Sequence, residues 1–211
     1  MANSNWSGKL SLASKRERAE GNEYYNIATK RDGIAPVLKR SKLQEAIKCY
    51  QKALNSAGSD LDAASSAAKN YAKTSYELLR MCSSEDGEMK NYFYRECLEH
   101  YSKALEYGEE CKSPEWLQQI EILYRELFDE VLDACYELVP TTQQRIAWLE
   151  SFCCVIRRGD KLYVNFSSEI AKFWLTEACV ALNEKDYKAS LNALKEIYRP
   201  IEEVKRFARC Q

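Results

Sequence analysis

The amino-acid sequence predicts an all-α protein, and three observations support this fold class. The 211 residues include only 7 glycines and 4 prolines, which stand at plausible boundaries between long segments of helical periodicity. Residues that cap helix N-termini precede several of these segments. The single β-like fragment, "KLYVNF" at 161–166, is too isolated to build a sheet.

Four helices are expected in the N-terminal half, after a flexible N-terminus at residues 1–9. The first contains "RAEGNEYYNIATKR". Ser41, followed three residues later by Gln44, forms a capping-box signature and predicts that the second helix begins there. Asp60 caps the third helix, which the turn-like "SSEDG" ends. The fourth helix ends at Gly108, a residue type common at helix C-termini.

The C-terminal half is also predicted to be helical. Ser113 caps a long helix that has Pro114 at its first position. A second capping-box signature begins the next helix, over 141–156. After an irregular connection over 158–166, the segment 167–211 is expected to hold a helix pair and a short capping helix.

Composition limits the classes of function. The chain is 45% hydrophobic and 30% charged, and its formal net charge is -1. This near balance argues against a general nucleic-acid or membrane-surface binder, which would carry a basic excess. The longest apolar runs are too short to span a bilayer, and the N-terminus lacks the apolar core of a signal peptide. A cytoplasmic protein with no membrane association is therefore expected.

The nine cysteines are predicted to be reduced thiols. Their number is odd, and no two of them form a C-x-x-C pair of the kind that usually supplies zinc ligands. Most of them stand where a small apolar residue would suit a helix face, so burial is expected. Reduced thiols are typical of intracellular proteins.

No catalytic residue, metal site or cofactor is predicted. His100 is the only histidine, and its charged neighbours predict a solvated position on a helix. The glycines do not cluster into a phosphate-binding loop. No Ser-His-Asp or Cys-His arrangement can be assembled without His100, and catalysis by lysine or carboxylates has no local signature, so the chain is expected not to be an enzyme.

Two segments, "EAIKCYQKAL" and "ECLEHYSKAL", share a pattern. Each has a small residue, an aromatic residue four positions later and an alanine three positions beyond that, all on one helix face. A related face in the C-terminal region carries Trp174 and Ala178. The residues of the first two faces are Ala46, Tyr50 and Ala53, and Cys97, Tyr101 and Ala104.

These segments resemble tetratricopeptide repeats (TPRs), helix–turn–helix units of about 34 residues. Gly21 and Tyr24 match the small and aromatic positions of a first helix, and the face that contains Ala46 matches a second helix. The resemblance implies antiparallel helix pairs stacked into a right-handed solenoid. Gly21 would then be small because the partner helix of its own hairpin crosses there.

The resemblance covers about half of the chain. Gly21 and Ala46 stand about a dozen residues further apart than in a standard repeat, so an insertion or helix extension is expected near 30–40. Ala68 or Ala72 is the candidate for the small position of the second unit. An unrelated helical bundle, whose alanine and tyrosine stripes are simply its core, is the alternative fold.

The resemblance divides the chain into segments. The expected divisions are a flexible N-terminus at 1–9, two TPR-like helix pairs at 10–110, a third and divergent set of helices at 111–157, an irregular connection at 158–166, and a TPR-like pair with a capping helix at 167–211.

The resemblance also suggests binding residues. In repeats that clamp the terminal carboxylate of heat-shock chaperones, a Lys or Arg precedes Gly-Asn as Arg18 precedes Gly21 and Asn22. Asn70 can supply the second asparagine. The Lys-x-x-x-Arg of the third repeat is missing, because Pro114 and Gln118 stand there. The predicted ligand-binding residues are Arg18, Asn22, Asn70 and Lys73.

The sequence thus predicts a non-enzymatic protein–protein interaction module, a scaffold or adaptor that binds a peptide or partner helix in a concave groove. One alternative is a binder of chaperone tails with an incomplete carboxylate clamp. Another is a binder of RNA or of an acidic surface through the basic segment 30–42, with a solvated loop as its plain interpretation. The cations of that segment are Lys30, Arg31, Lys39, Arg40 and Lys42.

Overall fold

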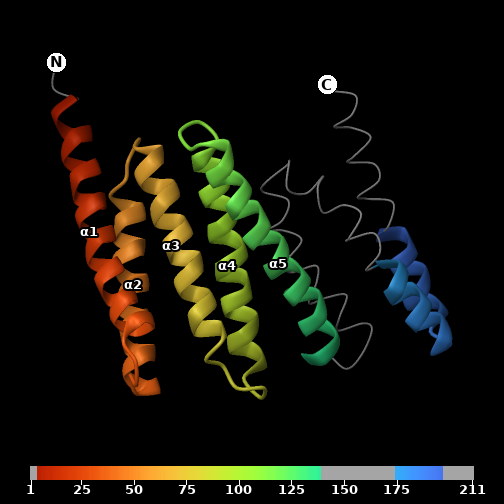
Figure 1. Cartoon of the computed structure of the whole chain (residues 1–211). Coiled ribbons are helices and arrows are strands. Elements are labelled where there is room, and N and C mark those ends of the chain that lie inside the picture. The colour runs from red at the N-terminus through yellow and green to blue at the C-terminus, as the bar shows by residue number, and fades with distance from the viewer. Residues whose placement is uncertain (1–3, 139–173, 197–211) are drawn as a thin grey trace. The chain divides into compact units, whose positions relative to one another are not determined.

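The structure, a computed structural model, describes residues 4–138 and 174–196. All regular elements in these two ranges are helices, which confirms the predicted all-α class for them (Figure 1). The predicted helix over 141–156, the connection over 158–166 and the capping helix lie outside the described residues. The long helices are α1 (Ser4–Lys30), α2 (Pro36–Asn55), α3 (Leu61–Leu79), α4 (Gly87–Gly108) and α5 (Pro114–Leu138), and shorter helical segments cover 174–183 and 187–196.

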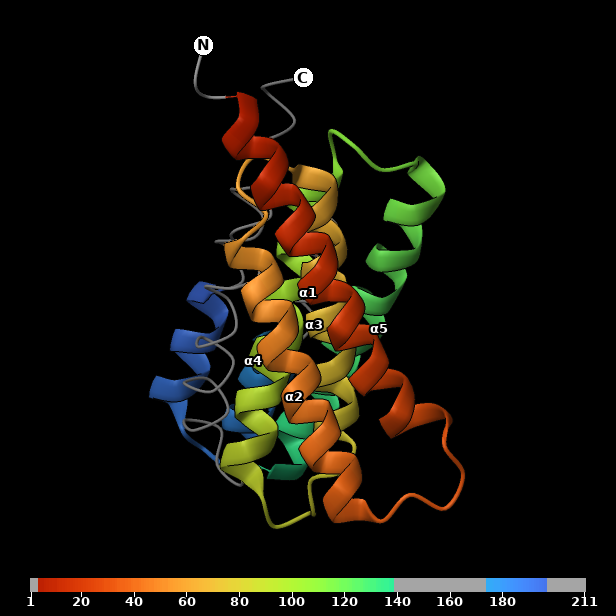
Figure 2. The ribbon, with the colours of Figure 1, turned by 90° about the vertical axis from the view of Figure 1, so that its left-hand side faces the viewer.

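The chain divides into two compact units, Met1–Leu127 and Phe128–Gln211. In the first unit, α1 packs on α2, α2 on α3 and α3 on α4, and α1 also contacts α3. Consecutive helices run in opposite directions, so α1–α2 and α3–α4 form two hairpins (Figure 1, Figure 2). The first helices of the two hairpins, α1 and α3, are therefore neighbours that run in the same direction.

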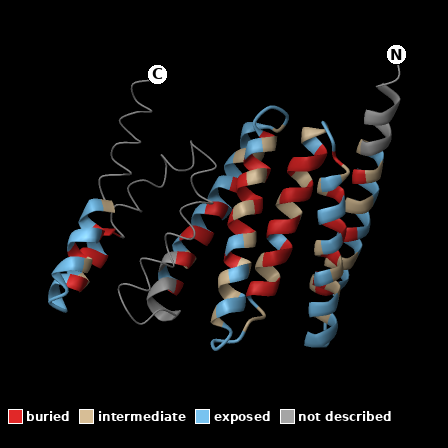
Figure 3. Ribbon diagram, turned by 180° about the vertical axis from the view of Figure 1, so that it is seen from behind, coloured by how far each residue is buried: buried red, intermediate tan, exposed pale blue. Residues whose placement is uncertain are grey.

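The core of the first unit is made by one apolar side of each helix (Figure 3). Tyr50 of α2 and Tyr71 of α3 are buried together with Ala46, and Tyr24 of α1 packs against them. Burying the apolar surface of such aromatic side chains stabilises the fold by about 25 cal/mol per Å². The matching faces predicted for α2 and α4 both lie in the core, since Ala46, Tyr50, Ala53, Cys97, Tyr101 and Ala104 are all buried.

Gly21 lies where α1 packs closely against Tyr50 of α2. A Cβ atom at this position would lie 2.7 Å from Cε1 and 2.9 Å from Cδ1 of Tyr50. Tyr50 is only 1% exposed, so its ring has little room to move. The buried Tyr50 ring therefore occupies the space that a side chain at position 21 would need.

The two hairpins are closed by equivalent hydrogen bonds. Ser14 Oγ of α1 donates to the carbonyl of Ala53 in α2, and Ser65 Oγ of α3 donates to the carbonyl of Ala104 in α4, both at 2.7 Å. Each bond spans 39 residues, and a shift of 51 residues carries Ser14 to Ser65 and Ala53 to Ala104. The hairpins therefore share one internal register.

The same shift places Ala72 where the first hairpin has Gly21. Ala72 is fully buried, and its carbonyl accepts a hydrogen bond from Cys97 Sγ of α4 at 3.5 Å. Cys97 in turn stands 51 residues after Ala46. Of the two candidates for the small position of the second hairpin, Ala68 and Ala72, the register selects Ala72.

Two predicted helix starts are confirmed. The Asp60 carboxylate accepts a hydrogen bond from Ala63 N at 2.9 Å and caps α3. Ser113 Oγ accepts from Trp116 N at 3.3 Å, and Pro114 is the first residue of α5. In both cases a side-chain oxygen satisfies an N–H group that the helix leaves without a backbone partner.

The predicted start of the second helix is wrong. α2 begins at Pro36 rather than at Ser41, so Ser41 lies inside the helix. Proline suits the first helical position because its φ angle is already helical and its missing N–H is not needed there. The segment near 30–40 is therefore a short turn containing Gly33, at φ 70°, followed by an extension of α2, and not an insertion with a structure of its own.

The flexible N-terminus predicted for residues 1–9 is also corrected, because α1 begins at Ser4. Extending a helix that is already formed costs much less than starting one, and no proline interrupts the sequence between residues 4 and 9. The helix therefore continues towards the N-terminus from its packed part.

The second unit contains the predicted C-terminal helix pair. Trp174 and Ala178 are buried, and Ser190 Oγ donates to the Ala178 carbonyl at 2.9 Å, which joins the segments 174–183 and 187–196. Lys185, in the turn between the two segments, has the left-handed conformation, at φ 62°. Across the described ranges, no helix combines the length and the apolar character needed to cross a membrane.

Candidate binding site

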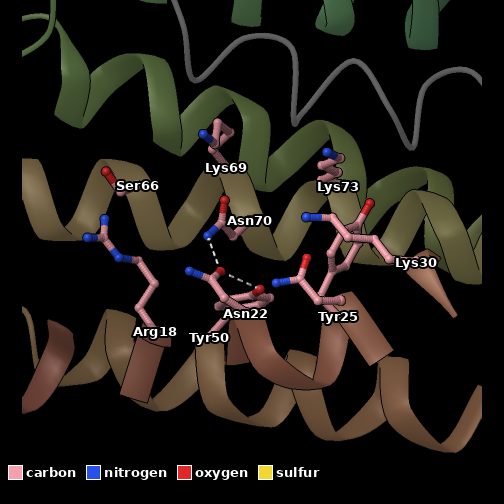
Figure 4. A pocket seen from close by; sticks show the side chains of 10 residues that line it. Arg18, Asn22, Tyr25, Lys30, Tyr50, Ser66, Lys69, Asn70 and Lys73 are labelled. Carbon is pink, nitrogen blue, oxygen red and sulfur yellow. Dashed lines mark hydrogen bonds between the residues drawn. The ribbon is translucent and has the colours of Figure 1, made fainter. Parts of the chain in front are cut away.

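A pocket of about 450 Å³ lies between α1 and α3 (Figure 4). All four predicted ligand-binding residues, Arg18, Asn22, Asn70 and Lys73, line it. They reach it from two helices that are far apart in sequence and adjacent in space. The other lining residues are Tyr25, Asn26, Lys30, Tyr50, Ser66 and Lys69.

The register of the two hairpins explains why these side chains meet. Arg18 and Asn22 are one turn apart on α1, and Lys69 and Lys73 are one turn apart on α3. The shift of 51 residues that relates the hairpins carries Arg18 to Lys69 and Asn22 to Lys73. Two neighbouring first helices thus present the same side to one pocket.

Asn22 is held in one orientation by two donors. Its Oδ1 accepts hydrogen bonds from the Tyr50 hydroxyl at 2.8 Å and from Asn70 Nδ2 at 2.9 Å. Burial raises the pKa of Tyr50 far above its usual range, so the hydroxyl keeps its proton and donates. With Oδ1 occupied, the Nδ2 group of Asn22 is the part that remains to donate to a ligand.

The pocket is strongly cationic. Four of its lining residues are basic, Arg18, Lys30, Lys69 and Lys73, and none is acidic. No carboxylate of the described ranges lies within ion-pair distance of these four side chains. Partial burial, followed by the nearby charges of Lys73, Lys112 and Arg18, lowers the pKa of Lys69. The pocket is thus electrostatically suited to an anion.

Aromatic rings lie beside two of the cations. Lys69 Nζ lies 5.5 Å from the centre of the Trp116 ring, and Lys73 Nζ lies 5.2 Å from the centre of the Tyr25 ring. Such contacts hold an ammonium group in place without neutralising its charge. The two lysines are therefore positioned while they stay available to an anionic ligand.

Ser66 connects the pocket to a cluster near the start of α5 that consists of Asp62, Lys112 and Trp116. Lys112 Nζ donates to Ser66 Oγ at 2.8 Å and to Asp62 Oδ1 at 2.6 Å, and it lies 5.1 Å from the centre of the Trp116 ring. Because Ser66 Oγ accepts the hydrogen bond from Lys112, its own O–H is free to donate. Ser66 thus adds a neutral donor at this edge.

Sequence reasoning missed several lining residues, above all Lys69, Ser66 and Tyr25. Lys69 could have been found, because it precedes Lys73 by one turn, as Arg18 precedes Asn22. Tyr25 and Ser66 carry no such signal in the sequence.

The basic segment 30–42 does not form a single patch. Lys39 pairs with Glu77 at 3.5 Å, Arg40 Nη2 donates to the Met81 carbonyl at 3.2 Å, and Lys42 lies 5.1 Å from the centre of the Tyr24 ring. Of the five cations, only Lys30 lines the pocket. Pro114 and Gln118, which replace the third clamp element, do not line it.

The prediction that His100 is solvated is wrong. The residue is 5% exposed, and its ring stacks on Tyr71 with centroids 3.7 Å apart. His100 Nδ1 lies 2.9 Å from the Glu96 carbonyl, and the Tyr71 hydroxyl donates to Glu96 Oε2 at 2.6 Å. Burial lowers the pKa of His100. The charged neighbours in sequence gave no sign of this packing, because it depends on α3.

The described cysteines differ in exposure. Cys49 and Cys97 are buried as expected, whereas Cys111 and Cys179 are exposed and Cys82 is half-buried. These five, the cysteines whose side chains the structure describes, are free thiols. In the described ranges, no group of three or more histidine, cysteine or acidic side chains is placed to hold a metal ion.

No protein-family model matches the chain, and no curated protein matches it at a significant level.

Proposed function

We propose that this chain is a non-enzymatic protein–protein interaction module, a TPR-like scaffold or adaptor that binds a peptide of a partner protein between α1 and α3. The observation that carries the proposal is the pocket itself. It gathers four cations and an oriented asparagine from two neighbouring helices, and none of its lining residues is acidic. Convergent cations and amides bind anionic groups of a peptide through charge-assisted hydrogen bonds.

The shared register of the hairpins supports the TPR-like part of the proposal. Equivalent Ser–Ala bonds and equivalent packing positions recur after 51 residues, as expected when one helix pair stacks on the next. The helices α1 to α4 have 27, 20, 19 and 22 residues. These lengths account for a repeat longer than the usual unit of about 34 residues.

The free thiols support a cytoplasmic site of action, since all five described cysteines are unpaired. A partner in the same compartment would present an exposed, acidic segment. A chaperone tail that ends in a carboxylate is one candidate, supported by the meeting of Arg18, Asn22 and Asn70 in one pocket.

The test is selection of binding peptides from a random displayed library, followed by affinity measurement with purified variants. We expect Arg18→Ala to weaken the selected peptides about tenfold to hundredfold, the effect of losing one charge-assisted hydrogen bond. The matched control is Arg31→Ala, which removes an exposed arginine that does not line the pocket. Arg18→Ala is preferred to Asn22→Ala, because the latter also leaves the Tyr50 hydroxyl without its acceptor.

The result that would overturn the proposal is a set of binding peptides that bind both variants equally, or no binding of any peptide, with or without a phosphate group. A steeply salt-dependent affinity for RNA that survives Arg18→Ala would favour the basic segment instead. Amidation of the peptide C-terminus tests the chaperone-tail candidate. A clamp for terminal carboxylates would bind the amidated peptide more weakly, whereas a site for internal acidic residues would bind both forms equally.

A further inference from the structure

The charge of the pocket exceeds what one carboxylate can neutralise. Arg18, Lys30, Lys69 and Lys73 line it without an acidic residue, although the whole chain has a net charge of -1. Lys69 and Lys73 are also one turn apart on α3, an arrangement of like charges that destabilises a helix. A ligand with two negative charges would relieve this repulsion better than a ligand with one.

The donors approach the pocket from more than one direction. Arg18 and the Asn22 Nδ2 group come from α1, whereas Lys69, Lys73 and the Ser66 hydroxyl come from α3 (Figure 4). A carboxylate offers two oxygens, which suit one planar donor group. A phosphate monoester offers three terminal oxygens in a pyramid and can accept from both helices at once.

The size of the pocket favours a phosphate that is attached to a larger molecule. A volume of about 450 Å³ falls in the range of sites that enclose organic ligands rather than a bare ion. Tyr25, which lines the pocket and packs its ring against Lys73, offers apolar surface to the residues next to the phosphate. A peptide with a phosphorylated side chain meets both requirements.

We infer that the pocket between α1 and α3 recognises a phosphorylated serine or threonine side chain of a partner peptide. Arg18 and the two lysines, Lys69 and Lys73, bind the phosphate oxygens, and Asn22 Nδ2 and the Ser66 hydroxyl complete the set of donors. This inference rests on the proposed function and specifies its ligand. Phosphorylation of the partner would then switch the interaction on.

The test compares three fluorescent peptide pools with randomised flanking residues. One has a central phosphoserine and an amidated C-terminus, the second has serine in its place, and the third has serine and a free C-terminal carboxylate. Fluorescence anisotropy should show that the phosphoserine pool binds at least about tenfold more tightly than the serine pool with the same amidated end. Equal affinity of these two pools would overturn the inference.

The variants Lys69→Gln and Lys73→Gln should each weaken the phosphoserine pool about tenfold or more, since each removes one charge-assisted contact. The matched control Lys52→Gln changes the net charge equally but alters an exposed lysine of α2 outside the pocket. An equal loss in Lys52→Gln would show that only overall charge matters and would overturn the inference.

The protonation state of the phosphate provides a second measurement. The second pKa of a phosphate monoester is about 6, so lowering the pH from about 7.5 to about 5.5 removes most of its second charge. The phosphoserine pool should weaken over this range, whereas a carboxylate ligand would keep its charge. An affinity for the phosphoserine pool that is constant with pH would contradict the inference.

Two further probes identify the source of the phosphate. Inorganic phosphate should compete only at much higher concentration than the phosphopeptide, and vesicles that contain phosphatidic acid should not retain the protein. Stronger binding to either probe than to the peptide would overturn the assignment to a peptide. If the free-carboxylate pool binds and the phosphoserine pool does not, the inference fails and the proposed function stands. If no pool binds, both fail.

Discussion

At the scale of single residues, Gly21 shows packing outweighing helix propensity. Gly21→Ala should improve the intrinsic helix propensity of α1 by about 1 kcal/mol. The added Cβ would nevertheless lie 2.7 Å from the buried Tyr50 ring. We therefore expect the variant to lose about 1–3 kcal/mol of unfolding free energy, measured by urea denaturation, because overpacking forces the two helices apart.

The control for this variant is Gly87→Ala. Nothing lies within 4 Å of a Cβ at Gly87, which is the first residue of α4. This second substitution should leave stability unchanged or slightly raised. Equal stability of the Gly21 variant and the wild type would show that α1 and α2 are further apart than the structure has them.

His100 links a single buried ring to the pH dependence of folding. Burial lowers the pKa of His100, which stacks on Tyr71 of α3 and is faced on α4 by Glu96, Glu99 and Lys103. The unfolded chain therefore takes up a proton first as the pH falls below about 6.5. The stability that the neutral ring contributes is present above that pH and is lost as the pH falls towards the folded-state pKa.

We accordingly expect wild-type protein to lose more stability than His100→Phe between about pH 7.5 and about pH 5. Phenylalanine keeps an aromatic ring against Tyr71 and cannot be protonated. The measurement is the urea midpoint of each protein at the two pH values. The acidic side chains are the same in both proteins, so their contribution to the pH dependence cancels in the comparison. Parallel losses in the two proteins would mean that His100 titrates normally in the fold.

At the scale of helices and hairpins, the Ser–Ala bonds differ in one respect. The N–H of Ala57, which would extend α2 by bonding to the Ala53 carbonyl, donates to the Leu54 carbonyl instead. The bond from Ser14 therefore serves a carbonyl near a helix end. The Ala104 carbonyl lies four residues before the end of α4, and α4 continues to Gly108.

Ser14→Ala should consequently cost about 1–3 kcal/mol, the effect of leaving a buried carbonyl without a donor. Ser65→Ala should cost only about 0.5–1.5 kcal/mol, the net value of an ordinary hydrogen bond. Ser41→Ala, at an exposed position inside α2, is the control and should stay within about 0.5 kcal/mol of wild type. If urea denaturation shows a larger loss of unfolding free energy for Ser65→Ala than for Ser14→Ala, this explanation is refuted.

Helix boundaries were predictable from the sequence where the capping is local. Asp60 and Ser113 act within three residues of their own positions, so the sequence alone identifies the starts of α3 and α5. The start of α2 was missed because Ser41 imitates a cap, whereas the chain is already helical from Pro36. Pro36 sets the start of α2, and the capping-box pattern takes no account of a proline that lies before it.

At the scale of the whole molecule, the reactivity of the cysteine thiols measures which parts of the chain exclude solvent. Cys49 and Cys97 lie in the cores of the first and second hairpins, whereas Cys111 and Cys179 are exposed. Iodoacetamide should label Cys111 and Cys179 rapidly in native protein, as mass spectrometry of the digested product would show. The two buried thiols should react only as fast as their hairpins open. Rapid labelling of Cys49 would contradict the packing of α2.

The candidate site was predictable from the sequence only in part. Arg18, Asn22, Asn70 and Lys73 follow from a resemblance between helix faces, and all four line one pocket. Lining residues such as Tyr25 were missed, because their placement depends on how α1 packs against α3. A local sequence pattern describes one face of a single helix, whereas this pocket is formed by the faces of two neighbouring helices.

The common register of the hairpins has a consequence for protein engineering. A duplicate of residues 14–64, inserted after Ala64, would place a new serine and a new alanine at the spacing of the existing Ser–Ala bonds. It would also bring its own copy of Asp60 to cap the helix that follows. The copied α1 would, however, bring Arg16, Glu17 and Glu20 to the positions where α3 buries Ala67, Ala68 and Tyr71. Because burying unpaired charges is costly, these three residues would have to become small or apolar before the array could gain a hairpin. With those changes, the number of pockets between adjacent first helices would grow with the number of copies.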